Sequence, residues 1–416
     1  MTAAGKRFMD QTTPVSELDV DSNARRNAII YSIAQAINGS IPPICFSVGA
    51  LTGYVLLGED KSLATVPVTG YTVGIALGAI PAAMLMRRVG RRNGFIFGSI
   101  VAMIAGLLAI YAIFEASFTM FTATMTLAGV SGAFVQQYRF AAADSGNAEM
   151  RARAISWVLA GGVVAAVIGP QSVIHTHDLF APIPFAGAFL ALSVLSSLGL
   201  VVLFFLRDDV RSVPAANAKV SGGRPFGEIA RQPQFIVAVI CGMGSYAMMS
   251  LMMTAAPLAM VACGLGEDNA ALGIQWHVLA MFGPSFFTGH LIARFGKERI
   301  IAVGMLLLAG GAIVALSGIA LMNFWVAMVL LGVGWNFGFI GATTMLTGTY
   351  RPEERSKVQG VNDFLVFGAV AISSFSSGQL LSRVGWDWMN YGFFPVIAIC
   401  LASLVWLFAP SRRPAH

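Results

Sequence analysis

Apolar segments long enough to cross a membrane follow one another along almost the whole chain, and this feature constrains the fold more than any other. A helix of about 20 residues spans the hydrocarbon core of a bilayer, where each backbone amide must find its partner within the same element. The segments lack the alternation of polar and apolar residues that a membrane β-barrel needs. Only 11% of the residues are charged, against roughly 25% in soluble proteins. We therefore predict an all-α integral membrane protein whose solvent is the bilayer.

Hydropathy predicts twelve transmembrane helices, and the distribution of charge predicts their orientation. The apolar segments lie at residues 28–57, 63–86, 94–114, 117–143, 154–174, 183–206, 234–262, 271–292, 299–321, 324–349, 358–381 and 388–409. Nearly all of the 26 Lys and Arg residues fall in the two tails and in alternate connections, whereas Lys61 and Arg383 fall in the other connections. By the positive-inside rule, both termini are cytoplasmic. The net charge of +6 is thus expected to reflect topology and not the binding of nucleic acid.

The sequence divides into two similar halves. A polar linker containing Gly and Pro, residues 207–233, separates predicted six-helix bundles at 28–206 and 234–409, with cytoplasmic tails at 1–27 and 410–416. A basic loop motif follows the second and the eighth predicted helix; it consists of Arg88, Gly90, Arg91 and Arg92 in the first half and of Gly289, Arg294, Gly296 and Lys297 in the second. Similar loops also follow the fourth and tenth helices, at nearly the same separation. Repeated loops at corresponding positions indicate a duplicated six-helix unit.

On these motifs the chain resembles the major facilitator superfamily over essentially its whole length. The loop after the second helix in that family reads Gly-x-x-x-Asp-Arg-x-Gly-Arg-Arg/Lys. This chain has Ala83 and Arg87 in place of the Gly and Asp, and Ala293 in place of the acid in the second copy. The resemblance implies two bundles that rock about a central site near the bilayer midplane, so that each side gains access in turn. We expect a monomeric transporter, not an enzyme, in the cytoplasmic (inner) membrane of a bacterium.

Four side chains of types that can bind soft metals lie on the seventh and eighth predicted helices. Met249 and Met253 are four residues apart, as are His277 and Met281, so each pair lies on one helix face. The two helices are joined by a short link, and at 1.5 Å per residue the pairs lie at matching depths. Thioethers with an imidazole suit Cu(I), and a histidine inside a span usually marks a site. The alternative is flexible packing, because the chain has 20 methionines.

This double motif resembles the CcoA-like copper importers, a branch of the same superfamily. The resemblance implies import of Cu(I) as the transported substrate, with no resident cofactor, for the assembly of haem–copper oxidases. It also implies Cys241 and Cys263 along the route, and copper chaperones in the cytoplasm or periplasm as partners. The same branch includes relatives that resemble riboflavin importers, so the substrate stays open.

A second polar group lies inside the spans. Gln137, Tyr138 and Arg139 are near the inner end of the fourth predicted helix, and Asp363 is in the eleventh. A charged residue within a span must face a cavity or a partner. An ion pair between Arg139 and Asp363 could form a gate between the halves; Arg139 could instead contact an organic substrate, or Asp363 could bind a proton.

Three functions follow from these observations. The leading hypothesis is a secondary transporter that imports copper by alternating access through Met249, Met253, His277 and Met281. The second is an importer of riboflavin or another small organic nutrient that uses Gln137, Tyr138, Arg139 and aromatic residues. The third is a membrane copper sensor or chaperone that binds the metal without transporting it.

Overall fold

The structure, a computed structural model, describes residues 17–143, 148–207 and 223–407. Residues 1–16 of the predicted N-terminal tail, residues 208–222 of the predicted linker and the predicted C-terminal tail lie outside the described residues, whereas residues 17–27 of the N-terminal tail form the start of the first helix. The first half contains α1 (Glu17–Asn38), α2 (Ile41–Leu56), α3 (Val66–Val89), α4 (Arg91–Phe114), α5 (Phe118–Val135), α6 (Tyr138–Ala143), α7 (Ala148–Thr176) and α8 (Ala186–Phe204). The second half contains α9 (Phe226–Ala230), α10 (Pro233–Ala262), α11 (Glu267–Phe282), α12 (Ser285–Phe295), α13 (Lys297–Leu316), α14 (Leu321–Thr347), a 3₁₀ turn (Pro352–Glu354), α15 (Arg355–Tyr391) and α16 (Phe393–Leu407).

The helices trace twelve crossings. In the described part of the chain, ten helical stretches are long and apolar enough to cross a bilayer. One of them, Lys357–Leu407, has 51 residues, about twice what one crossing needs, and it turns at Gly385, whose φ of 83° is not helical. It therefore makes two crossings. α11 and α12 together make one more, broken at Gly283 and Pro284. The predicted fold, all-α with twelve spans in two bundles, is confirmed.

Each half packs around its own apolar core. In the first half, α3 packs closely on α5. The absence of a side chain at Gly129 permits this approach: a Cβ added there would collide with the Tyr71 carbonyl oxygen and would lie 3.0 Å from the Gly74 Cα. Lipid is as apolar as a helix surface, so such close approach through small residues is the main source of helix association in a membrane. The core of the second half is rich in methionine and is formed mainly by α10, α13, α14 and α16.

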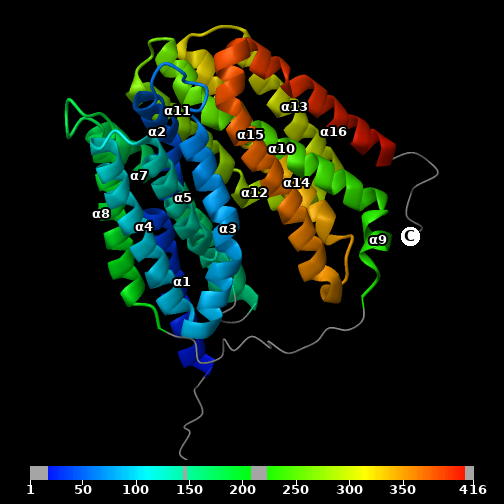
Figure 1. Cartoon of the computed structure of the whole chain (residues 1–416). Helices are drawn as coiled ribbons and strands as arrows, with labels where there is room; N and C mark the ends of the chain where they lie inside the picture. The colour runs from blue at the N-terminus through cyan, green and yellow to red at the C-terminus, as the bar shows by residue number, and fades with distance from the viewer. Residues whose placement is uncertain (1–16, 144–147, 208–222, 408–416) are drawn as a thin grey trace, which may run out of the picture.

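The basic loops show that the two halves are structurally related. Gly90 joins α3 to α4 with a φ of 85°, and Gly296 joins α12 to α13 with a φ of 88°. Left-handed backbone of this kind favours glycine, which lacks the Cβ that would clash. We call the end of the molecule that carries these loops the basic end. It also carries the start of α15 and the C-terminal end of α14 (Figure 1).

The two bundles meet at the end opposite to the basic end. There α11 packs against α7 and α2, and α15 packs against α3. Hydrogen bonds cross this contact from Gln171 Nε2 to Gln275 Oε1 (2.9 Å), from Thr69 Oγ1 to Ser374 Oγ (3.2 Å) and from the Gly378 N–H to Thr65 Oγ1 (3.2 Å). A hydrogen bond of 3.0 Å joins His177 Nε2 to Asp268 Oδ1. Towards the basic end the bundles diverge (Figure 1), so the structure is closed at one end and open at the other.

The end of the linker is fastened to the second bundle. Arg224 donates three hydrogen bonds of 2.7–3.0 Å to the Glu354 carboxylate, whose side chain is only 2% exposed. The Arg351 N–H donates a fourth, at 2.9 Å. The Arg224 guanidinium, together with the Arg351 N–H, lowers the pKa of Glu354 from its ordinary 4.5 to about 2.

We expect the Glu354→Gln variant to melt at a lower temperature than the wild type at pH 7. A carboxyl whose pKa is lowered by folding stabilises the protein fully above its unfolded pKa, and this stabilisation is lost as the pH falls towards the folded pKa. The difference in Tm should therefore persist down to about pH 4.5 and shrink as the pH falls further towards 2. Thermal scans of the purified protein from pH 7 to pH 3 measure it, with the exposed neighbour changed in Glu353→Gln as the control. A Tm difference that is the same at pH 7 and pH 3 would contradict the role of this pair.

Candidate functional site

Two opposite charges from different bundles are exposed near one another. Arg139 lies in α6, just after Gln136 and Gln137 interrupt the helix between α5 and α6. Its side chain is exposed. Asp363 lies in α15 and is also exposed; its Oδ1 accepts a hydrogen bond of 3.2 Å from Asn362 Nδ2. Arg139 is within electrostatic range of Asp363 and of the Tyr246 hydroxyl. Within the described residues the two charges form no direct ion pair. The structure therefore brings Arg139 and Asp363 near one another without closing the contact.

A group of four aromatic side chains adjoins these charges. Tyr246 of α10 lies 5.3 Å from Trp335 and 5.0 Å from Phe339 between ring centroids, both in α14, and 5.8 Å from Phe367 in α15. The Trp335 and Phe339 rings lie 5.3 Å apart with an angle of 15° between their planes. Tyr246, Phe339 and Phe367 remain partly exposed. We call these four residues the aromatic group; it presents flat apolar surface beside a charged edge.

Trp335 carries an unused hydrogen-bond donor within this group. Its side chain is 8% exposed, and its Nε1 is buried without a hydrogen-bond partner in the described residues. Leaving a buried N–H without an acceptor costs on the order of 1–3 kcal/mol. A ligand that offers an acceptor at this position would recover that free energy.

Tyr138 and Gln137 are placed differently from Arg139. Tyr138 is fully buried in the first bundle, where its hydroxyl accepts a hydrogen bond of 2.9 Å from Asn38 Nδ2 and its ring packs against Phe95 and Tyr31. Gln137 is half-buried at the break between α5 and α6. Of the three consecutive residues expected to contact an organic substrate, Arg139 alone is exposed beside the aromatic group.

The four predicted metal ligands are all buried in the second bundle. Met249, Met253 and Met281 are buried in one apolar cluster, and His277, on the same stretch of α11 as Met281, is fully buried. His277 Nδ1 lies 2.9 Å from the Met328 carbonyl oxygen, so this nitrogen carries the proton, while Nε2 has no partner in the described residues. The hydrogen bond to α14 gives His277 a structural partner that the spacing in the sequence does not reveal.

The two cysteines expected along a metal route differ in their exposure. Cys241 is buried against α16, with its sulfur 3.8 Å from the Cys400 carbonyl oxygen and from Ser403 Oγ. Cys263 is exposed at the C-terminal end of α10. Among the described residues there is no cluster of three or more His, Cys, Asp or Glu side chains suited to a metal ion.

The residues of the basic loops lie at the surface of the basic end, away from the aromatic group. Arg92 Nη2 donates a hydrogen bond of 2.8 Å to the Phe204 carbonyl oxygen at the end of α8, and Arg294 lies over the ring of Phe295 at 5.2 Å. Arg88 and Arg91 flank Gly90, Lys297 follows Gly296 at the start of α13, and Gly289 lies within α12. They connect consecutive helices within each bundle, which keeps each bundle a unit.

The sequence predicted that aromatic residues contact an organic substrate, but not which ones. The signal of the aromatic group is weak, because Tyr246 and Phe367 are single aromatic residues in apolar helices, and the spacing of Trp335 and Phe339 by four is equally typical of packing. The fold brings three helices together and thereby creates the group.

Comparison with known proteins places the chain in a family. The family model described as Major Facilitator Superfamily matches residues 27–285 and 277–416. The riboflavin transporter RfnT of Brucella anthropi is 52% identical over 394 residues, which cover 94% of this chain and 98% of the relative. The uncharacterized MFS-type transporter YddS of Bacillus subtilis is 27% identical and covers 95% of both chains. A D-xylose–proton symporter of known structure has a TM-score of 0.67 at 13% identity, over 94% of this chain and 96% of its own, and shares the fold.

These findings correct the predicted substrate. The similarity to a riboflavin transporter along almost the full length of both chains contradicts copper import, and with it the expected link to haem–copper oxidase assembly and to copper chaperones. The resemblance to the branch that includes riboflavin importers holds, whereas its copper-specific part is not supported. The error has a physical origin, since methionines four residues apart with a buried histidine serve packing as readily as metal binding. On the match to the family model and on the twelve-helix fold, the chain is a multi-pass membrane transporter that belongs to the major facilitator superfamily.

Proposed function

We propose that this protein imports riboflavin, or a flavin of closely similar structure, across the bacterial cytoplasmic membrane by alternating access. The observation that carries the proposal is the 52% identity to a riboflavin transporter over 94% of this chain. The protein acts as a monomer with both termini in the cytoplasm, as the positive-inside rule indicates, and the two bundles at 28–206 and 234–409 move against one another.

The chemistry of the aromatic group supports a flavin as the substrate. The isoalloxazine ring of riboflavin is flat and aromatic, with carbonyl oxygens and ring nitrogens along one edge. Its face can stack on Tyr246 or Phe339, which are partly exposed. An acceptor on the edge of the ring can accept a hydrogen bond from the Trp335 Nε1–H, which has no partner in the described residues. Such a site is largely apolar with a few placed polar groups, as small-molecule sites usually are.

The charged pair supports recognition of the polar side of a flavin. The guanidinium of Arg139 is a planar donor suited to two neighbouring acceptors, such as a carbonyl oxygen and a ring nitrogen. The Asp363 carboxylate accepts hydrogen bonds only, so it suits an imide N–H or the hydroxyls of the ribityl chain. Because the two residues come from different bundles, a substrate between them would contact both moving parts.

The conformation fits the release step of an importer. With the basic end in the cytoplasm, the structure is closed to the outside and open to the inside. Arg139 and Asp363 lie on the open side, within electrostatic range but not in direct contact. We infer that the bundles bring these two charges together when the cytoplasmic side closes, so that the pair stabilises the outward-open state.

Uptake of labelled riboflavin tests the function. We expect a bacterium that lacks its own riboflavin synthesis and uptake to accumulate riboflavin when it expresses this chain, and labelled copper uptake to stay at the level of the empty vector. Unlabelled riboflavin should compete with the label, and unlabelled xylose should not. Absence of riboflavin accumulation by a protein shown to reach the membrane would exclude the proposal.

An exchange of charges tests the gate. Arg139→Asp and Asp363→Arg are each expected to reduce riboflavin uptake about tenfold or more, because either change places two like charges where opposite charges meet during closure. The double variant should recover a substantial part of the uptake, which a purely structural role for either residue would not produce. Double-mutant analysis of initial rates measures the coupling. Strictly additive losses would show that the two residues act independently.

A further inference from the structure

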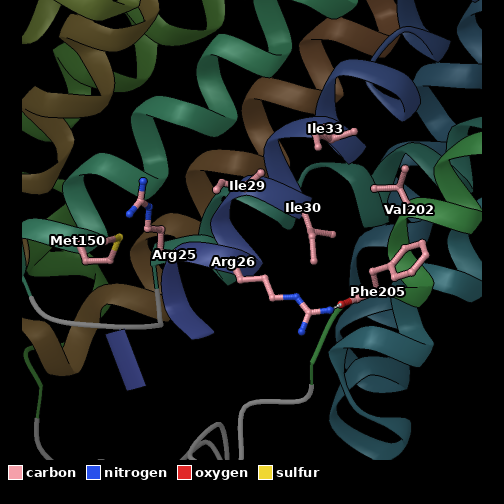
Figure 2. A pocket seen from close by; sticks show the side chains of 8 residues that line it. All are labelled: Arg25, Arg26, Ile29, Ile30, Ile33, Met150, Val202 and Phe205. Atoms are coloured by element: carbon pink, nitrogen blue, oxygen red, sulfur yellow. Dashed lines mark hydrogen bonds between the residues drawn. The ribbon is translucent and has the colours of Figure 1, made fainter. Parts of the chain in front are cut away.

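A hollow on the flank of the first bundle lies outside the proposed transport site. It is formed by α1, the start of α7 and the end of α8 at the basic end (Figure 2). α8 packs on α1 and α4, at the edge of the bundle away from the second half (Figure 1). The hollow therefore opens towards the surrounding bilayer and not towards the space between the bundles.

The hollow combines an apolar floor with two cations. Arg25, Ile29 and Ile33 recur every four residues, so they lie along one face of α1, and both isoleucines are more than 40% exposed. Val202 and the exposed Phe205 complete the apolar side from the end of α8. We call Ile29 and Ile33 the apolar track. It begins one helical turn after Arg25 and runs towards the middle of the membrane.

The two arginines have donors to spare. Arg26 Nη2 donates one hydrogen bond of 3.2 Å to the Phe205 carbonyl oxygen, and a guanidinium has five N–H groups. Arg25 has no hydrogen-bond or ion-pair partner among the described residues, and the lining of the hollow contains no acidic side chain. In Figure 2 the two guanidinium groups extend to opposite sides of the floor formed by Ile29 and Ile30. The end of the hollow nearest the basic end thus carries a positive charge on each side.

We propose that this hollow is a binding site for a phospholipid with an anionic headgroup. Its anionic headgroup interacts with Arg25 and Arg26, and one acyl chain follows Ile29 and Ile33 with Phe205 beside it. Basic pockets between helices at the cytoplasmic side of a membrane recognise anionic lipid headgroups, each Lys or Arg near the surface adding attraction. A free phosphate would use the arginines but would leave the apolar track uncovered, so charge and apolar surface together favour a lipid.

The bound lipid would stabilise the first bundle. It would bridge the start of α1 to the end of α8. This junction already contains the Arg26 contact, the paired hydrogen bonds of 3.0 and 3.2 Å between Asn27 and the Arg207 backbone, and a hydrogen bond of 3.0 Å from Arg207 Nη1 to Asn23 Oδ1. Both helices belong to one bundle. We therefore expect the lipid to raise the Tm while leaving the choice of transported substrate unchanged.

Binding of phosphatidylglycerol to the purified full-length protein tests the site. We expect retention of phosphatidylglycerol over phosphatidylcholine in native mass spectrometry and a higher Tm with the anionic lipid. Arg25→Gln should weaken phosphatidylglycerol binding about fivefold, the contribution typical of one basic residue near a membrane surface. Arg25 is the residue to change, because Arg26 also holds the end of α8. Arg25→Lys should keep most of the binding.

Two controls make the result decisive. Arg299→Gln removes one positive charge from an exposed position at the start of α13 in the other bundle and should leave lipid binding unchanged. The Tm of Arg25→Gln in phosphatidylcholine should match that of the wild type, which separates loss of the site from loss of the fold. Equal retention of both lipids, an equal Tm shift with inorganic phosphate alone, or unchanged binding in Arg25→Gln would overturn the proposal.

Discussion

Tyr246→Ala is expected to weaken the apparent affinity for riboflavin about tenfold or more. Tyr246 is the centre of the aromatic group, with ring contacts to Trp335, Phe339 and Phe367, and it remains partly exposed beside Arg139. Stacking of a flat heterocycle on an aromatic side chain contributes roughly 1–3 kcal/mol, as measured by alanine replacement for nucleic-acid bases. A loss in that range corresponds to about fivefold to more than a hundredfold. Initial rates of riboflavin uptake over a range of concentrations measure it.

The replacement of the same residue by phenylalanine separates the ring from the hydroxyl. If stacking carries the affinity, Tyr246→Phe keeps uptake within about threefold of the wild type, because the ring contacts remain. Tyr111→Ala is the matched control, since Tyr111 is 54% exposed on α4 in the first bundle. An unchanged affinity in Tyr246→Ala, in a protein that reaches the membrane in normal amount, would remove the aromatic group from the substrate site.

A disulfide across the closed end is expected to stop transport. A Cβ added at Gly378 of α15 would lie 2.6 Å from Thr65 Oγ1 and 2.9 Å from Thr65 Cγ2, so cysteines at both positions place their Cβ atoms within the roughly 3.5–4.5 Å range of natural disulfides. Thr65 belongs to the first bundle and Gly378 to the second. Alternating access requires these two positions to separate. Oxidation of the Thr65→Cys, Gly378→Cys protein should therefore reduce riboflavin uptake to the level of the empty vector.

Reduction of the bond should restore the transport. The four native cysteines are unpaired, and three of them are buried, so each single-cysteine variant serves as the oxidised control. The fraction of cross-linked protein is measured by the number of titratable thiols before and after a reducing agent. Full uptake with complete cross-linking would mean that this end does not open during transport, and it would contradict the proposed mechanism.

The architecture was predictable because its causes are local. A run of apolar residues must be helical in lipid whatever surrounds it, because each backbone amide must find its partner within the same element. The basic loop motif also predicted the duplication, and Gly90 and Gly296 have nearly the same φ. The interruption of the eighth span was harder to place, although Pro284 lies at the break. A proline or glycine within a span is tolerated when neighbouring helices satisfy the freed backbone groups, so the sequence alone does not tell a break from a bend.

The candidate site was predictable only in part, as Arg139 and Tyr138 illustrate. Both are polar residues at the end of one span, and the sequence gives no reason to separate them. In the structure Tyr138 bonds to Asn38 inside the first bundle, whereas Arg139 is exposed near Asp363. One residue of difference turns a side chain by about 100° around a helix, which decides between core and cavity.

The sequence by itself determined that this protein is a twelve-helix membrane transporter built from two related halves, because hydropathy, charge and repeated loops act over short stretches of chain. Only the tertiary structure decided which polar and aromatic residues share one space. Tyr246, Trp335 and Phe367 are more than 30 residues apart in sequence from one another and come from three helices. The contacts that unite them depend on how the helices pack, and helix packing is a property of the whole bundle, set by close approach of small residues and not by any one segment.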